Sequence, residues 1–316
     1  MKELELYIHI PFCKSKCHYC DFLSFCGKDE LIDEYVECVR FEAREVGQGI
    51  KSDIQNKYVD KVEVATIYIG GGTPSYIDSK YIVQIMKDIS ENFDVNQDAE
   101  ITLEVNPGTV DRQKLMEYKE AGINRLSIGL QSTNNELLKM LGRIHTYEEF
   151  EATYKMAREI GFNNINIDFI IGLPNQTMND IDEMLKTAEN LKPEHISVYS
   201  LIVEEGTKIE EKIQNKELEL PDENLEREMY WTVKNGLENV GYSHYEISNF
   251  ALQGKEAKHN LDCWNQKEYL GIGAGAHSYS DDARFSNIDN LEEYIKNTKE
   301  NKLENNFVFH EKQDKS

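Results

Sequence analysis

Strand-like and helix-like segments alternate along the first two thirds of this chain, and this alternation limits the fold more than any other feature. Six runs rich in apolar and β-branched residues are separated by segments whose apolar residues recur at helical spacing. Repeated strand–helix units are typical of a parallel sheet with helical crossovers. We predict strands at 4–10, 64–69, 100–105, 125–130, 164–171 and 196–201, and helices at 31–46, 80–93, 111–120, 135–141, 147–159 and 179–190.

The pattern changes after residue 201, where a charged stretch begins. We predict a helix at 228–239, a strand at 243–247 and a Gly-rich loop at 271–275 in this second part. The two parts are expected to be an α/β domain over residues 1–205 and a smaller α/β extension over residues 206–316. The chain stops at a charged tail, 307–316, with no predicted fold of its own, so we expect the extension to be incomplete.

Charge and hydropathy exclude several classes of protein. The chain carries 35 basic and 58 acidic side chains, a formal net charge of −23, which repels nucleic acid unless a local basic patch is present. The first ten residues contain acids where a signal peptide needs basic ones. The longest nearly apolar run, residues 165–173, is too short to span a bilayer. We therefore expect a cytoplasmic protein with neither a membrane span nor a nucleic-acid partner.

Three of the six cysteines form the sharpest motif in the chain. Cys13, Cys17 and Cys20 follow the first predicted strand with spacings that let one loop surround a small inorganic core. Cysteine thiolates are the usual ligands of iron–sulfur clusters, and three of them leave one iron of a four-iron cluster open for chemistry. Structural zinc normally needs four ligands. His18 or Cys26 would supply the fourth, so zinc remains the alternative.

Polar groups and glycines recur at the carboxyl ends of the later predicted strands. These features are the segments 70–74, 104–107, 129–132 and 172–174, together with Asp168. In a (β/α) barrel the strand ends form one rim, where active sites are built. Taken singly, Glu104 and Asp168 have ordinary explanations as caps or ion-pair partners, and Arg143 as a surface ion pair. Their convergence on one rim predicts a binding site.

These motifs resemble those of the radical S-adenosylmethionine (radical SAM) superfamily, whose signature is the Cys-x3-Cys-x2-Cys loop. The strings YIHIPFCKSKCHYCDF, GGGTPS, LEVNPG, SIGLQS, NIDFIIGLP and GIGAGAHSY narrow the resemblance to one group, and they extend from residue 7 to residue 279. That group contains the oxygen-independent coproporphyrinogen III oxidases and the HemW heme chaperones. The resemblance implies an open (β/α)6 partial TIM barrel with a C-terminal α/β extension.

The resemblance also implies two cofactors and a set of contacts. Cys13, Cys17 and Cys20 would hold a 4Fe-4S cluster whose open iron binds S-adenosylmethionine, which one electron cleaves to a 5′-deoxyadenosyl radical. The electron would come from a reductant such as flavodoxin or ferredoxin. Ile202 and His277 fall where the oxidases contact a second S-adenosylmethionine. The implied contacts to the first are Tyr7, Gly71, Gly72, Thr73, Glu104, Gln131, Arg143 and Asp168.

Two local features separate the chaperones from the oxidases. The oxidases carry a further cysteine two residues after the third, where this chain has Phe22. Chaperone-like members carry an HNxxYW motif associated with heme, and this chain has His259, with Cys263 in place of the tyrosine and Trp264. The resemblance therefore favours a heme chaperone of porphyrin and heme metabolism that transfers heme to apo-haemoproteins, with His259 and Cys263 as heme candidates. The alternative is an oxidase that decarboxylates two propionates of coproporphyrinogen III, so whether the chain is an enzyme stays open.

Overall fold

The computed structural model describes residues 2–56, 58 and 61–310. Its centre is a parallel sheet whose six strands match the six predicted runs. The register pairs each strand with the next one along the chain, as repeated right-handed crossovers require. The strands are β1 (Lys2–Ile10), β2 (Val62–Gly71), β3 (Val95–Val105), β4 (Arg125–Gln131), β5 (Ile165–Ile171) and β6 (His195–Ser200).

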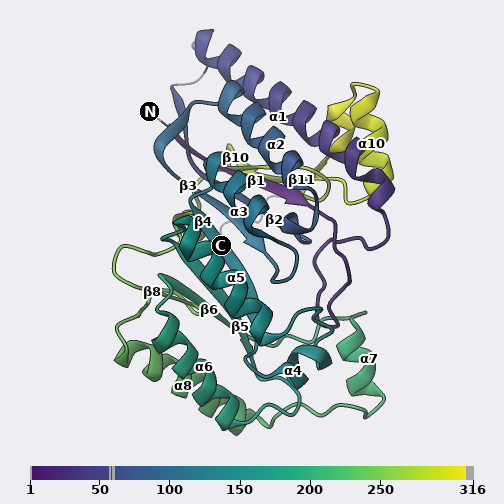
Figure 1. Ribbon diagram of the computed structural model, residues 1–316. Helices are drawn as coiled ribbons and strands as arrows, with labels where there is room; N and C mark the ends of the chain where they lie inside the picture. Colours follow the sequence, from purple (N-terminus) through teal and green to yellow (C-terminus); the bar gives the residue numbers. More distant parts are fainter. Residues whose placement is uncertain (1, 57, 59–60, 311–316) are drawn as a thin grey trace.

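Helices cover one face of this sheet. In Figure 1, α1, α2, α3 and α5 follow one another across the same side, and each contacts the next. All six predicted helices are present, with α1 extending nine residues further than predicted. They are α1 (Ile32–Gln55), α2 (Ser79–Asn92), α3 (Arg112–Glu120), α4 (Asn135–Met140), α5 (Tyr147–Ile160) and α6 (Met178–Leu191).

Local sequence signals set the ends of these helices. Thr146 and Glu149 form a capping box at the start of α5, where each side chain accepts a hydrogen bond from the other residue's backbone N–H. Gly161 ends the same helix in the left-handed conformation, with φ of 100°. The chain can therefore turn back at once into β5.

The alternation of side chains along β1 separates the core from the inner face of the sheet. Leu4, Leu6, Ile8 and Ile10 point toward α1 and α2 and are buried in the main hydrophobic core. The intervening Glu5, Tyr7 and His9 point to the opposite face, because successive side chains of a strand alternate. This inner face is the one on which we expect the site.

The described residues after 205, up to residue 310, extend the same sheet at both edges. β8 pairs antiparallel with β6 at one edge, and β9 pairs parallel with β1 at the other. The order is β12-β11-β10-β9-β1-β2-β3-β4-β5-β6-β8-β7, so the sheet is open, as predicted. The added elements are α7 (Lys208–Gln214), α8 (Glu223–Asn239), β7 (Ser243–His244), β8 (Asn249–Ala251), α9 (Lys258–Trp264), β9 (Tyr269–Ile272), β10 (His277–Ser280), β11 (Ala283–Asn287), α10 (Leu291–Lys299) and β12 (Phe307–Phe309).

Three expectations for this second part need correction. Of the strand predicted at 243–247, only Ser243 and His244 form a strand, β7. Tyr245 N–H donates to Asn249 O, so the chain turns there and the next strand, β8, begins at Asn249. The first two residues of the predicted Gly-rich loop, 271–275, belong to β9. The tail at 307–316 begins with a strand, β12, and its last six residues lie outside the described residues.

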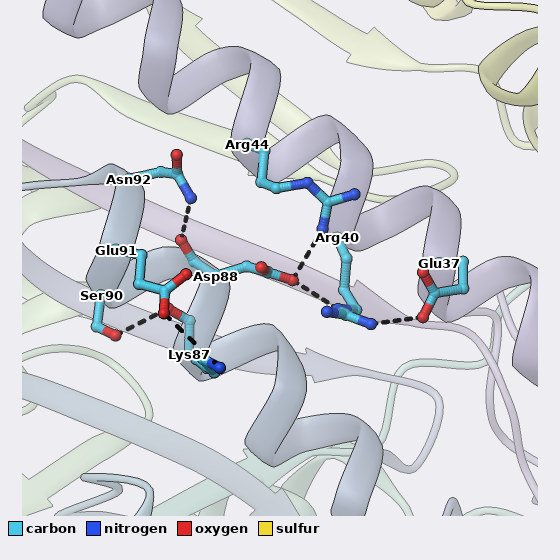
Figure 2. A network of polar contacts seen from close by, with 8 residues as sticks. All are labelled: Glu37, Arg40, Arg44, Lys87, Asp88, Ser90, Glu91 and Asn92. Carbon is cyan, nitrogen blue, oxygen red and sulfur yellow. Dashed lines mark hydrogen bonds and ion pairs between the residues drawn. The ribbon is translucent and has the colours of Figure 1, made fainter.

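An ion-pair network joins the first two helices. Figure 2 shows Arg40 and Arg44 on α1 pointing at Asp88 on α2. Arg40 Nε donates to Asp88 Oδ2 at 2.5 Å, and Arg44 Nη1 donates to the same oxygen at 3.1 Å. Glu37 contacts the other side of the Arg40 guanidinium at 2.5 Å. The Asp88 side chain is only 7% exposed, so the network fixes the spacing of the two helices behind the sheet.

No helix in the described part of the chain is both long and apolar enough to cross a membrane.

Candidate cluster and cofactor site

The cysteine loop leaves the carboxyl end of β1 and is held in place by backbone hydrogen bonds. Cys13 N–H donates to Phe25 O at 3.0 Å, and Phe25 N–H donates to Pro11 O at 2.7 Å. Further along the loop, His18 N–H donates to Leu141 O, which follows α4, at 2.9 Å. Cys13 is buried, whereas Cys17 and Cys20 are partly exposed. The loop is therefore tied to the sheet at its base and to the α4 region at its tip.

The glycine-rich turn after β2 packs directly on this loop. Gly72 N–H donates to Ile10 O and Thr73 N–H donates to Phe12 O, both at 2.9 Å. A Cβ atom on Gly72 would lie 2.9 Å from Phe12 O, and one on Gly71 would lie 2.5 Å from the His9 imidazole. Gly71 also has a φ of +114°, which side chains rarely adopt. Residues 71 and 72 must therefore be glycine for the turn to lie this close to Phe12 and His9.

Arg143 stands between the cysteine loop and the strand ends. Its Nη2 donates to Asn106 Oδ1 at 2.6 Å and to Gly129 O at 2.7 Å, and its Nη1 donates to Cys17 Sγ at 3.5 Å. Its Nε is buried with no hydrogen-bond partner among the described residues. An orphaned buried donor is a sign of a missing anionic ligand group, because leaving such a group unpaired is unfavourable.

Thr73 connects the same network to the first cysteine. Its hydroxyl lies 3.3 Å from Cys13 Sγ and accepts a hydrogen bond from Asn106 Nδ2 at 2.9 Å. Burial raises the pKa of the Cys13 thiol to about 11, and the hydrogen bond from Thr73 opposes that rise. A bound metal would reverse this balance, because coordinated thiols are deprotonated.

Glu104, at the end of β3, is a buried carboxyl group held by two donors. The Tyr68 hydroxyl donates to its Oε1 at 2.9 Å, and Gly71 N–H donates to its Oε2 at 3.1 Å. Burial raises the pKa of Glu104 to about 7, while the hydrogen bond from Tyr68 acts in the opposite direction. The charge of the Glu104 carboxyl group therefore changes near neutral pH. Glu104 also binds Gly71, in the glycine-rich turn that packs on the cysteine loop.

The remaining predicted contacts complete the rim. The Tyr7 hydroxyl donates to His9 Nδ1 at 2.9 Å, and His9 Nε2 donates to Leu23 O at 2.9 Å. Asp168 accepts from Asn166 Nδ2 at 2.7 Å and from the Ser127 hydroxyl at 3.2 Å. Gln131 has a φ of 72°, and the register between β4 and β5 shifts beside it. This local irregularity changes the direction of the chain at the end of β4.

All eleven residues predicted for the cluster and S-adenosylmethionine line one cavity of about 570 Å³. That volume lies within the range of small-molecule sites in proteins. The cavity, the three cysteines on its wall and the orphaned Arg143 Nε fit an iron–sulfur cluster with a zwitterionic ligand. Among the described residues, no three His, Cys, Asp or Glu side chains converge closely enough to hold a single metal ion. The cysteines therefore border a space and do not surround one point.

Several lining residues are absent from the sequence-based prediction. Asn106 bridges Arg143 and Thr73, and Tyr68 orients Glu104. Asn106 lies in the LEVNPG string at a strand end, so its position in the sequence could have identified it as a residue of the site. Tyr68 lies within β2, where an aromatic residue is ordinarily read as sheet packing. Ile202, which the resemblance places at a second S-adenosylmethionine, and Phe22 also line the cavity and are largely exposed, at 68% and 66%.

The heme candidates lie elsewhere on the inner face. His259, on α9, is only 7% exposed, and its Nδ1 lies 2.6 Å from the Thr66 hydroxyl. Its ring also lies against Tyr68, with centroids 5.3 Å apart. Cys263, on the same helix, is exposed. His277, predicted to touch a second S-adenosylmethionine, is exposed on β10 and is not in the cavity wall.

Comparison with known proteins identifies relatives along nearly the whole chain. The profile of the Radical SAM superfamily matches residues 7–188. The heme chaperone HemW of Bacillus subtilis (strain 168) is 40% identical over 290 residues, which cover 92% of this chain and 74% of that protein. The heme chaperone HemW of Escherichia coli (strain K12) is 38% identical over 280 residues, covering 88% and 70%.

A solved structure shares the fold. Coproporphyrinogen III oxidase (HemN) from Escherichia coli, described as a radical SAM enzyme, superposes with a TM-score of 0.82 at 26% sequence identity. The superposition covers 99% of this chain and 72% of the oxidase. This chain therefore shares its fold with an oxidase, and the fold alone does not identify the activity of this chain.

Proposed function

Since this chain belongs to the radical SAM superfamily and, within it, to the HemW family, we propose that it is a heme chaperone that binds heme and transfers it to apo-haemoproteins. The observation that carries the proposal is the sequence identity to proteins named heme chaperone HemW, 36% to 40% over 88% to 93% of this chain. The superfamily implies a 4Fe-4S cluster and S-adenosylmethionine as resident cofactors.

We assign the cluster to Cys13, Cys17 and Cys20, which border the cavity. When bound, the cluster and S-adenosylmethionine supply one-electron chemistry that generates a carbon radical. The protein's part is to bind, orient and shield them. Arg143 offers its unpartnered buried Nε to a carboxylate, and the glycine turn at Gly71 and Gly72 lets a ligand approach the backbone closely.

The remaining S-adenosylmethionine contacts divide by chemistry. Glu104 and Asp168 are acids that favour the cationic parts of the ligand, because a carboxylate stabilises a nearby positive charge. Tyr7, Thr73 and Gln131 are neutral groups on the wall of the same cavity. A reductant such as flavodoxin or ferredoxin would deliver the electron. A cytoplasmic location belongs to the same proposal, because reduced thiols are maintained there.

The residue at position 22 favours the chaperone over the oxidase. The oxidases carry a further cysteine where this chain has Phe22, whose exposed ring lines the cavity mouth. A phenyl ring there supplies neither a thiol nor a charge for the four carboxylates of coproporphyrinogen III. It does supply an apolar contact, which suits the planar face of a porphyrin.

Of the two heme candidates, Cys263 is the accessible one. Its thiol is a possible axial ligand, since heme iron is bound by Cys as well as by His. His259 contacts Thr66 and Glu5 on the inner face of the sheet, so we infer that its role is to hold α9 against that face. On this proposal His259 affects heme binding only through the position of that helix.

An anaerobic experiment separates the two functions. Reconstituted protein is titrated with ferric heme, and is separately incubated with S-adenosylmethionine, reductant and coproporphyrinogen III. Saturable binding of one heme per chain, together with no protoporphyrinogen in the chromatogram, supports the chaperone. Coupled formation of 5′-deoxyadenosine and protoporphyrinogen would instead identify an oxidase and overturn the interpretation of Phe22.

A further inference from the structure

The inner face of the sheet continues beyond the cofactor cavity onto β9, β10, β11 and β12. Tyr7, which lines the cavity, stands opposite Gly271 of β9 in the register. Tyr269 pairs with Tyr279 in the antiparallel β9–β10 ladder, and His277, two residues before Tyr279 on β10, lies on the same face as Tyr279. His277 is therefore on the same face as Tyr7, two strands away.

The same face carries a second histidine. His277 pairs with Ser286 of β11, and Ser286 pairs with Val308 of β12, so all three side chains lie on the inner face. The His310 ring stacks on the His277 ring, with centroids 5.5 Å apart and planes 14° apart. His310 Nε2 lies 3.0 Å from the Ser286 hydroxyl, which fixes the orientation of the stack.

His277 is the member of this pair that is free to bind a metal. Both histidines are exposed, and neither ring nitrogen of His277 has a hydrogen-bond partner in the part of the chain that the structure describes. Burial, and then the neighbouring His310 and Arg284, lowers the pKa of His277 below its ordinary value. The imidazole is therefore neutral at pH 7, which is the form that ligates iron.

A cation and apolar surface adjoin the pair. Arg284, exposed on β11, lies over the Tyr279 ring at 5.1 Å, and its Nη1 donates to the Tyr269 hydroxyl at 3.5 Å. Within the described residues no carboxylate forms an ion pair with it. Val308 is 41% exposed on the same face.

We propose that this surface is the heme-docking site, with His277 as the iron ligand and Arg284 as the partner of a propionate. Heme requires an axial ligand, a flat apolar contact and cations for two carboxylates. On a chain of net charge −23, an arginine without an acidic partner among the described residues, beside an exposed imidazole, is a specific match to an anionic metal porphyrin. His310 is a positioning residue that holds the His277 ring through the stack. The inference rests on the proposed heme-chaperone function and assigns its binding site.

Ferric heme titrations of the whole chain, followed by absorption and by electron paramagnetic resonance, test the assignment. We expect His277→Ala to weaken heme binding about tenfold or more and to remove the imidazole signature from the spectrum. Added imidazole should restore that signature. His310→Ala should weaken binding less, by about threefold, because the ligand itself remains.

Arg284→Gln separates charge from packing. It should weaken binding of heme about tenfold and leave binding of heme dimethyl ester, which has no free carboxylates, unchanged. His244→Ala, on β7 at the opposite edge of the sheet, is the matched control and should bind heme like the wild type.

These titrations distinguish an error in the site assignment from an error in the proposed function. If the wild type binds heme and His277→Ala binds it equally well with an unchanged spectrum, the site assignment is wrong and the chaperone proposal survives. If the wild type binds no heme at all, the proposed function fails and the site fails with it. If Cys263→Ala alone removes the iron ligand, the ligand is on α9 and His277 is excluded.

Discussion

The three cysteines of the loop are chemically different from one another before any cluster binds. Cys13 is buried beside the Thr73 hydroxyl, whereas Cys17 accepts a hydrogen bond from Arg143. We expect Cys13→Ala, Cys17→Ala and Cys20→Ala each to lose the 4Fe-4S cluster, because three thiolates are the minimum set that the loop provides. Iron and sulfide content after anaerobic reconstitution measures the loss.

The other cysteines are matched controls for that experiment. Cys26 is exposed six residues after Cys20, and Cys38 is buried in α1, where its thiol donates to Ile295 O at 3.7 Å. Both Cys→Ala variants should retain wild-type iron content. Iron loss in Cys26→Ala would mean that the site has four ligands, and the zinc alternative would then return.

Glu104 predicts a pH dependence of cofactor binding. Its carboxyl group, with a pKa raised to about 7 by burial, is mostly protonated at pH 6 and mostly ionised at pH 8. The ionised form favours the sulfonium cation of S-adenosylmethionine, so affinity should rise with pH through this range, by up to about tenfold per unit below the pKa. Calorimetric titration between pH 5.5 and 8 measures it.

Glu104→Gln is the control for this pH dependence, because the amide keeps the shape of the side chain and does not titrate. The variant should bind S-adenosylmethionine more weakly than the wild type at pH 8, with a flat profile. A wild-type profile that is flat, or that falls with pH, would contradict the role given to Glu104.

Individual site residues could be predicted where a motif fixes them. Glu104, Arg143 and Asp168 follow from strand ends and from family resemblance, and all three line the cavity. The contact of His9 with the glycine-rich turn could not be predicted, because it depends on how closely Gly71, on the neighbouring strand, approaches the imidazole. Sequence spacing has no information on such a contact. The same holds for the stack of His277 on His310.

At the scale of elements, the contact between α1 and α2 depends on one buried carboxylate. Asp88 accepts from Arg40 and from Arg44, as Figure 2 shows, and its side chain is nearly buried. Asp88→Ala removes the carboxylate that Arg40 and Arg44 share and leaves Arg40 only the exposed Glu37. We expect a loss of about 2–4 kcal/mol in the free energy of unfolding, because breaking a buried ion pair is strongly destabilising. Chemical denaturation gives the value.

Glu37 provides the comparison for Asp88. It contacts the same Arg40, but its side chain is 61% exposed. Exposed ion pairs contribute little, so Glu37→Ala should change the free energy of unfolding by about 0.5 kcal/mol or less. Equal losses in the two variants would show that burial does not decide the strength of this network.

Long elements could be predicted from the sequence, and short ones could not. The six central strands and their helices have enough residues to show a period, and all appear in the structure. β7, β8 and β12 have only two or three residues each, so no alternation can be recognised. The helix α10 also went unpredicted, although Asn290 caps it by accepting from Glu293 N–H at 2.9 Å. That cap was a signal in the sequence.

At the scale of the whole molecule, the second part of the chain protects both edges of the sheet. β9 covers β1, and β8 covers β6. Glu42 of α1 is buried and accepts hydrogen bonds from Gly273 N–H, Asn287 Nδ2 and the Tyr294 hydroxyl, which ties the two parts together. The division at residue 205 stays a prediction, and a fragment tests it.

A fragment ending at residue 205 should fail to fold cooperatively, because it leaves both edge strands unpaired. Circular dichroism during thermal unfolding would show a broad transition or aggregation, in contrast to the intact chain. A cooperative transition close to that of the intact chain would show instead that residues 1–205 are an independent domain. The sheet order behind this expectation could not be predicted from sequence, because β1 and β9 pair across more than 250 residues.

Delivery of heme to another protein is the property that defines the proposed chaperone. The most direct measurement is transfer from the heme-loaded chain to a b-type apo-haemoprotein, followed by absorption spectroscopy after the two proteins are separated. We expect the acceptor to gain the spectrum of its holo form while the chain loses an equal amount of heme. Heme that stays on the chain, or an acceptor that gains none, would contradict it.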